Sequence, residues 1–204
     1  MLPTLGDDSL RLRPQQETDL TVLATFLAHP SVRHWFGSDT VDDLRPWPEG
    51  ARSELDGQPF TIEIDGQVAG WLQVSEEPTP DYRHAGLDIM LGPDFQDRGA
   101  GPAALKLAAR WMVEELGHHR ITIDPSVDNP RAIAAYRKVG FRDVGVMRRY
   151  GRNADGTWSD ALLMDLLAQL HAALRERLEA PGELGRSDAS MRALHTFKGG
   201  ARLA

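Results

Sequence analysis

The residue pattern with the clearest chemical meaning is a glycine turn that joins a short apolar strand to a helix. It reads Leu87-Asp-Ile-Met-Leu-Gly-Pro-Asp-Phe-Gln-Asp-Arg-Gly-Ala-Gly-Pro-Ala-Ala104. Small residues at Gly99, Ala100 and Gly101 let the backbone come close to a ligand. The first turn of the following helix presents amides without partners inside the helix, and the helix dipole adds to their attraction for an anion. The turn therefore predicts a phosphate site, although it does not say which phosphate.

A carboxylate lies on the strand that leads into this turn. Asp88 stands between Leu87 and Ile89, where a buried carboxylate without a partner is costly. A functional role for Asp88 is therefore favoured over a structural one. The acidic segment from Ser75 to Arg83, which we expect to be a loop, comes just before that strand. Its carboxylates are either plain solvated surface or hold ammonium groups of a substrate, and the candidates for such binding are Glu76 and Glu77.

Composition and charge narrow the class of protein. The chain has 204 residues, 41% of them hydrophobic, and no cysteine, which excludes disulfides, thiolate ligands and an acyl-cysteine intermediate. The net charge of -7 argues against a nucleic-acid ligand and is compatible with a cationic small molecule as substrate.

No apolar run or signal sequence indicates a membrane or secretion, so a cytoplasmic protein is expected. His118-His119 lack a third ligand, so no metal site is expected. A monomer and a homodimer are both compatible with the sequence.

Periodicity and turn signals predict strands and helices in alternation. Strands are expected at Leu10–Arg13, Pro59–Ile64, Gln67–Val74, Ala85–Leu91, Arg120–Ile123, Phe141–Val146 and Asp160–Leu167. Helices are expected at Glu17–Leu27, Gly101–Leu116 and Pro130–Val139, with a short one near Val41–Leu44. The rest of His29–Arg52 is expected to be irregular. Asp65-Gly66 and Asp155-Gly156 predict hairpin turns.

The C-terminal part of the chain is expected to stand apart. Residues 1–167 form one predicted domain, and residues 168–204 a C-terminal extension. Ala168–Ala180 has the pattern of one amphipathic helix, and the residues after Pro181 are polar and glycine-rich, which is typical of a mobile tail.

Two motifs together resemble a known superfamily. Gln96-Asp-Arg-Gly-Ala-Gly101 is similar to the Gln/Arg-x-x-Gly-x-Gly/Ala signature of the GNAT superfamily of acetyl-coenzyme A-dependent N-acyltransferases. Asn129-Pro-Arg-Ala-Ile-Ala-Ala-Tyr-Arg-Lys-Val-Gly-Phe141 resembles the next helix of that superfamily, with its Asn, its Tyr and its terminal Gly-Phe. The resemblance implies the GNAT fold, an α/β (α+β) architecture with a mixed, mostly antiparallel central sheet flanked by helices.

The same resemblance implies acetyl-coenzyme A as co-substrate. It places the pyrophosphate on the amides of Arg98 to Ala103, with the Arg98 side chain as a second contact. Pro102 lacks an amide hydrogen, which leaves one donor fewer. Asn129 precedes Pro130 and is also an ideal helix cap, so capping is the alternative to a coenzyme contact. The implied coenzyme-binding residues are Leu91, Gln96, Arg98, Gly99, Ala100, Gly101, Pro102, Ala103, Asn129 and Tyr136.

A narrower resemblance covers Leu10 to Leu167. Val32-Arg-His-Trp-Phe-Gly37, Gly86-Leu-Asp-Ile-Met-Leu91 and Thr122-Ile-Asp-Pro-Ser-Val-Asp-Asn-Pro-Arg-Ala-Ile133 are similar to segments of the aminoglycoside 6′-N-acetyltransferases. This resemblance implies that Asp88 contacts the antibiotic as a base, that Asp124 binds substrate and that Tyr136 is the general acid. The chain departs from the family where Ile123 separates Thr122 from Asp124, in its shorter acidic segment, and in its C-terminal extension.

Two aromatic residues have either a packing role or a role in the site. Trp35 is either a packing residue or a platform for the substrate, and Tyr136 is either a core aromatic or lies beside the departing sulfur. The expected reaction is direct attack of a neutral primary amine on the thioester in a ternary complex. A carboxyl of ordinary pKa, about 3.9, is a poor proton acceptor from an amine, so Asp88 is either base or anchor, with waters as an alternative proton path.

Three functions follow from these observations. The first is an aminoglycoside 6′-N-acetyltransferase that confers resistance. The second is an acyltransferase for a lysine-type amine, in siderophore assembly or on a protein. The third is a coenzyme-binding module without catalysis, against which Asp88 and Tyr136 argue.

Overall fold

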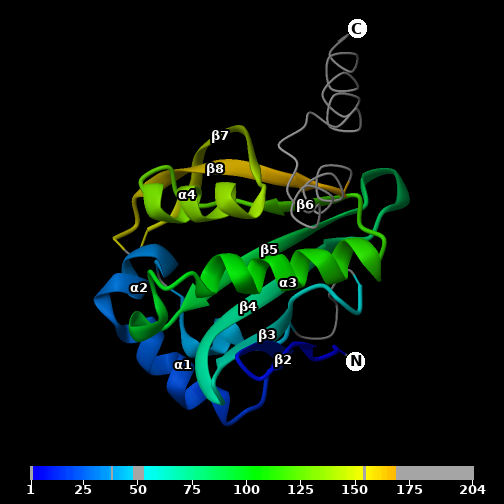
Figure 1. Cartoon of the computed structure of the whole chain (residues 1–204). Coiled ribbons are helices and arrows are strands. Elements are labelled where there is room, and N and C mark those ends of the chain that lie inside the picture. The colour runs from blue at the N-terminus through cyan, green and yellow to red at the C-terminus, as the bar shows by residue number, and fades with distance from the viewer. Residues whose placement is uncertain (1, 38, 48–52, 154, 169–204) are drawn as a thin grey trace, which may run out of the picture.

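The computed structural model describes residues 2–37, 39–47, 53–153 and 155–168 (Figure 1). The predicted helix Ala168–Ala180 and the tail after Pro181 lie outside the described residues, apart from Ala168 itself.

An eight-stranded sheet forms the centre of the described structure, in the order β1-β2-β3-β4-β5-β6-β8-β7. Every neighbouring pair is antiparallel except β5 and β6, which are parallel. Asp65 and Gly66 both have positive φ, 49° and 76°, as the predicted tight hairpin between β3 and β4 requires. The strands are β1 (Leu5–Gly6), β2 (Leu10–Pro14), β3 (Gln58–Ile64), β4 (Gln67–Glu77), β5 (His84–Leu91), β6 (Arg120–Ile123), β7 (Arg142–Arg152) and β8 (Trp158–Leu167).

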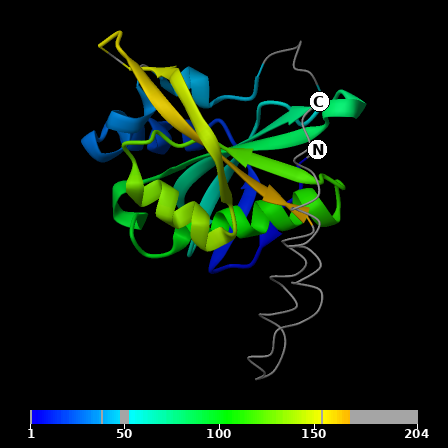
Figure 2. The same cartoon turned by 90° about the horizontal axis from the view of Figure 1, so that it is seen from above.

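Helices cover both faces of the sheet, as Figures 1 and 2 show. One face carries α3 and α4, and the other carries α1 and α2. The helices are α1 (Asp19–Ala28), α2 (Pro30–Phe36), α3 (Ala100–Glu114) and α4 (Pro130–Val139), with short 3-10 turns η1 (Val41–Leu44), η2 (Pro80–Tyr82) and η3 (Pro93–Phe95). The α/β prediction, with a mostly antiparallel sheet between helices, is confirmed.

Two apolar clusters hold these layers together. The larger one joins α3 and α4 to the sheet, and its fully buried members include Leu105, Met112 and Phe60, whose ring meets the edge of Trp111 at 5.6 Å between centroids. The smaller one joins α1 and α2 to the opposite face through Trp71. Each fully buried large side chain contributes about 1.5–3 kcal/mol. The sheet is therefore a rigid support for residues on both of its faces.

The parallel contact between β5 and β6 is short. It has two register pairs, Ala85 with Ile121 and Gly86 with Thr122. Beyond Gly86 the two strands are no longer paired. The next residue of β5 on the α2 side of the sheet is Asp88, which lies opposite Gln73 of β4. The sheet therefore opens beside Asp88 of β5 and Asp124, the residue that follows β6.

Three predictions of local structure are wrong. The segment after His29 is not irregular, because Pro30 and a His29 side chain that accepts from the Ser31 amide start α2. Ser75 to Arg83 is not wholly a loop, because β4 continues to Glu77 against the start of β5. β7 extends to Arg152, beyond the predicted end.

Candidate active site

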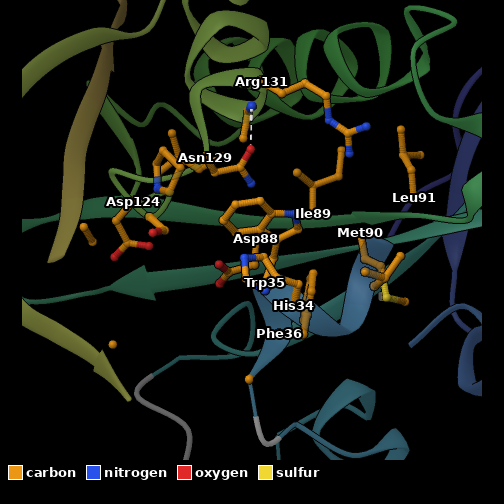
Figure 3. A pocket seen from close by; sticks show the side chains of 18 of the residues that line it. His34, Trp35, Phe36, Asp88, Ile89, Met90, Leu91, Asp124, Asn129 and Arg131 are labelled. Atoms are coloured by element: carbon orange, nitrogen blue, oxygen red, sulfur yellow. Dashed lines mark hydrogen bonds between the residues drawn. The ribbon is translucent and has the colours of Figure 1, made fainter. Parts of the chain in front are cut away.

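A cavity of about 1220 Å³ opens at the divergence of β5 and β6. Segments that are distant in the sequence contribute to its wall. Figure 3 shows Asp88, Asp124, Asn129 and Trp35 pointing into the same space. The predicted site residues that line it are Trp35, Asp88, Leu91, Gln96, Gly99, Gly101, Pro102, Asp124, Asn129 and Tyr136.

The glycine turn contributes backbone to the cavity. Asp97 and Gly99 both have positive φ, 59° and 81°, and this double turn sends the chain into α3. A Cβ on Gly99 would meet no protein atom within 4 Å, so the space over this residue is open to a ligand. A Cβ on Gly101 would lie 3.4 Å from Leu91 Cδ1. The first turn of α3 therefore faces the cavity with bare backbone, which fits a phosphate group.

Gln96 is engaged with protein groups on three sides. Its Nε2 donates to the Leu91 carbonyl at 3.0 Å and to the Ser31 hydroxyl at 3.4 Å, and its Oε1 accepts from Arg131 at 3.0 Å. The side chain thus ties β5, α2 and α4 together. Gln96 shapes the site from its edge rather than offering a free amide to a ligand.

The helix α4 brings Asn129 and Tyr136 to the cavity. Asn129 caps the helix, since its Oδ1 accepts from the Ala132 amide at 3.0 Å (Figure 3). Tyr136 packs against Phe141, with ring centroids 6.3 Å apart. Burial, and then the charges of Asp88 and Asp124, raise the pKa of Tyr136 well above its usual range. Its hydroxyl therefore stays protonated at any working pH.

Three carboxylates line the cavity beside these groups. Asp88 is open to the cavity but deeply surrounded by protein, and this burial, with the charges of Asp124 and Asp39, raises its pKa to about 7. Burial also raises the pKa of Asp39 and of Asp124. None of the ion pairs between described residues includes any of the three. Burial therefore outweighs the opposing effects of Arg33 on Asp39 and of Tyr150 on Asp124, and a cation bound in the cavity would favour the charged carboxylates.

Tyr150 is a wall residue near Asp124. The interaction of its hydroxyl with the Asp124 carboxylate, followed by burial, raises the pKa of Tyr150 to about 12. β7 is irregular between Met147 and Gly151, and Arg149 has a φ of 52°. A bulge of this kind redirects side chains.

Glu76 and Glu77 do not line the cavity, contrary to the expectation from sequence. Because β4 continues through them, alternation places Glu76 on the opposite face of the sheet from Asp88. There it is buried beside Arg83, 3.4 Å away, and His118, 3.1 Å away. Glu77 accepts from the Thr79 amide at 3.0 Å and so shapes the turn that follows.

Three predicted coenzyme residues also lie off the cavity wall. The Arg98 side chain lines a separate hollow of about 530 Å³ with Phe26 and Phe95. Ala100 and Ala103 belong to the first turns of α3 but are not among the wall residues. For these two residues only a backbone contact stays a prediction.

Asp39, Arg131 and Tyr150 are wall residues that the sequence reasoning missed. The signal for Asp39 was the acidic run after Gly37, and Arg131 lies within the second motif that carries the resemblance. Nothing in the sequence around Tyr150 indicated its place. Among the described residues, no cluster of three His, Cys, Asp or Glu side chains is arranged to hold a metal. The helices of this part of the chain include none that is long and apolar enough to cross a membrane.

Residues 9–142 match the family described as Acetyltransferase (GNAT) domain. The chain therefore belongs to the GNAT acetyltransferase family, and the prediction of an N-acetyltransferase is confirmed.

Relatives within this family differ in their acceptors. Spermidine N(1)-acetyltransferase of Escherichia coli K12 is 27% identical over 179 residues, which are 86% of this chain and 93% of the relative. Aminoglycoside N(6′)-acetyltransferase type 1 of Klebsiella pneumoniae is 26% identical over 161 residues, which are 71% of this chain and 79% of the relative. The solved structure of spermidine N-acetyltransferase from Vibrio cholerae in complex with CoA and spermine has a TM-score of 0.68 at 19% identity, and covers 81% of this chain and 99% of that one. At 19% identity, the similarity to this solved structure shows a shared fold alone.

Proposed function

We propose that this enzyme transfers the acetyl group of acetyl-coenzyme A to a primary amine of a small molecule that carries two or more ammonium groups. One observation carries the proposal. Asp39, Asp88 and Asp124, without protein cations in ion pairs with them among the described residues, line the same cavity as the glycine turn. A site that joins an anion-binding backbone to three carboxylates without ion-pair partners among the described residues suits an anionic donor and a cationic acceptor.

The donor half of the cavity fits acetyl-coenzyme A. Gly99 and Gly101 leave the backbone bare at the start of α3, where a pyrophosphate would meet amides and the positive end of the helix. When bound there, acetyl-coenzyme A supplies the thioester whose acetyl group is transferred. Leu91 and Asn129 would border it on the β5 and α4 sides.

Asp88 is placed to bind and deprotonate the amine. A pKa of about 7 is far better matched to this task than that of an ordinary carboxyl, about 3.9. The ammonium first gives charge-assisted hydrogen bonds to the carboxylate. One ammonium proton then passes to Asp88, and the neutral amine so formed uses its lone pair to make the new bond to the carbonyl carbon. The carboxyl later returns this proton to solvent through the open cavity. Asp88 thus first binds the ammonium group and then accepts a proton from it.

Tyr136 assists departure of the thiolate. Its pKa is raised, so full proton transfer to a thiolate with a pKa of about 8.5 is uphill. The phenol therefore donates a hydrogen bond while the carbon–sulfur bond breaks. The thiolate takes up, by way of solvent, the second proton that the nitrogen loses when it becomes an amide. In total, an ammonium and a thioester give an amide, a thiol and one proton.

A linear polyamine is the first candidate acceptor. It is supported by the likeness to the spermidine acetyltransferase over 86% of this chain. An aminoglycoside is the second candidate, supported by the residues from Asp88 to Ile133 and by the Klebsiella relative. A lysine-type amine offers one cation only, and a module without catalysis would have no use for Asp88 and Tyr136 in one cavity.

The test is release of thiol from acetyl-coenzyme A with purified protein. The acceptors are spermidine, spermine, kanamycin and tobramycin. Nα-acetyl-lysine amide, whose side-chain amine is free, is the single-amine control. Turnover of either polycationic group above the single-amine control supports the proposal, and the better group decides between the two candidates. Equal turnover of the control, or no turnover with any acceptor, would refute it.

A further inference from the structure

Arg131 connects the helix α4 to the glycine turn. Its Nη2 donates to Gln96 Oε1 at 3.0 Å, and its Nη1 donates to Asp97 Oδ2 at 3.2 Å. Both acceptors lie immediately before Gly99, and Arg131 itself lies in the first turn of α4. The guanidinium therefore bridges the two motifs that form the donor half of the cavity.

The conformation of the turn needs such support. Asp97 has a φ of 59°, a region that costs most residues with a Cβ about 1–2 kcal/mol and that Asp adopts more readily than most. Gly99 reaches its φ of 81° without this cost, so the strain of the turn is concentrated at Asp97. The hydrogen bond from Arg131 holds the strained residue by its carboxylate.

Gln96 extends the connection to two further elements. Through Nε2 it reaches the Leu91 carbonyl at the end of β5 and the Ser31 hydroxyl in α2. An amide that is held on three sides has one favourable orientation, and Arg131 supplies the third side. Losing the guanidinium would leave Gln96 Oε1 and the Asp97 carboxylate without these hydrogen bonds and would hold Gln96 through Nε2 alone.

We propose that Arg131 is a positioning residue, which fixes the glycine turn through Gln96 and Asp97 in the conformation that binds the coenzyme. The proposal rests on the proposed donor site. It concerns order in the turn rather than stability of the fold, because an exposed pair such as Arg131–Asp97 contributes little to unfolding free energy.

The test is the dissociation constant of coenzyme A, measured by calorimetry on the full chain. Arg131→Gln is expected to weaken binding about five- to thirtyfold, as for coupled contacts worth about 1 to 2 kcal/mol. Arg137→Gln is the matched control, because Arg137 is on the same helix and pairs with Asp143 at similar exposure, away from the cavity. It should bind like the wild type, and both variants should melt at nearly the same temperature.

Three further measurements separate positioning from direct contact. Gln96→Ala and the double variant Arg131→Gln/Gln96→Ala should be non-additive, since both break one network. Arg131→Lys, which can reach one acceptor but not both, should recover part of the affinity. Dephospho-coenzyme A should lose as much affinity as coenzyme A on Arg131→Gln, whereas a loss confined to coenzyme A would show a direct contact with the 3′-phosphate and overturn the inference.

Failure of the inference differs from failure of the proposed function. If Arg131→Gln binds coenzyme A like the wild type, positioning by Arg131 is wrong while the donor site stands. If the wild-type protein itself does not bind coenzyme A, the proposed function and this inference both fall.

Discussion

Replacing Asp88 with Asn should remove both the activity and its dependence on pH near neutrality. With a pKa of about 7, one-tenth of the Asp88 carboxyls are ionised at pH 6, so kcat/KM should fall about tenfold for each pH unit below 7. A carboxyl of ordinary pKa, about 3.9, would leave the rate flat between pH 5.5 and 8. Loss of a general base lowers the rate about 10²- to 10⁴-fold, which is the expectation for Asp88→Asn.

The assay is thiol release at subsaturating amine across pH 5.5 to 9. The substrate amine titrates near pH 10 and is mainly the ammonium that Asp88 binds throughout this range, so its titration adds no break near pH 7. The break near pH 7 should therefore be present in the wild type and in Asp81→Asn, an exposed control carboxylate outside the cavity wall, and absent in Asp88→Asn. A wild-type profile without that break, or an Asp88→Asn variant that keeps it, refutes the assignment.

Thermal unfolding gives an independent reading of the same pKa. Because the folded-state pKa of Asp88 is raised, the folded protein holds a proton that the unfolded chain releases above pH 3.8. Stability due to this residue therefore falls as the pH rises from about 4 to 7 and stays low above it. Asp88→Asn should melt higher than the wild type at pH 8 and close to it at pH 4. Equal differences at both pH values would contradict the raised pKa.

Three further changes test other parts of the structure. Tyr136→Phe removes a hydrogen bond to a developing charge, worth about 1.5–3 kcal/mol, so kcat should fall about 10- to 100-fold in steady-state assays, and an unchanged kcat would exclude the role. Asp39→Asn should raise the KM of a triamine about three- to tenfold and that of a monoamine less, and equal effects would remove Asp39 from the acceptor site. Asp19→Ala breaks the buried network in which Asp19 accepts from Arg13 at 2.7 and 2.8 Å and from Thr61 at 2.7 Å. For Asp19→Ala, urea titration should show a free energy of unfolding lower by about 3–5 kcal/mol. A decrease below about 1 kcal/mol would mean that this network does not stabilise the fold.

Local signals in the sequence were sufficient for most of the fold. The apolar spacing of α3, the Asn-Pro start of α4 and the Asp-Gly turn between β3 and β4 each act over a few residues, and each was predicted. Helix α2 was missed because its start depends on His29, a residue that is not a usual N-cap. The burial of Glu76 was missed because its partner His118 lies more than forty positions away in the chain.

The candidate site was predictable only where a motif carries it. Asp88, Gly99, Asn129 and Tyr136 fall within matching segments and do line one cavity. Asp39 joins them from an element that the sequence left undefined, and proximity of this kind is set by tertiary packing. Residue spacing alone therefore could not show that three carboxylates share a cavity.

Identification of the reaction product tests the central claim most directly. With the best acceptor from the thiol-release panel, mass spectrometry and NMR of the isolated product should show one acetyl group on a primary amine nitrogen, in equal amount to the thiol released. Asp88→Asn should form little of this product. Thiol release without an N-acetylated product, or acetylation that is unaffected in Asp88→Asn, would contradict the account.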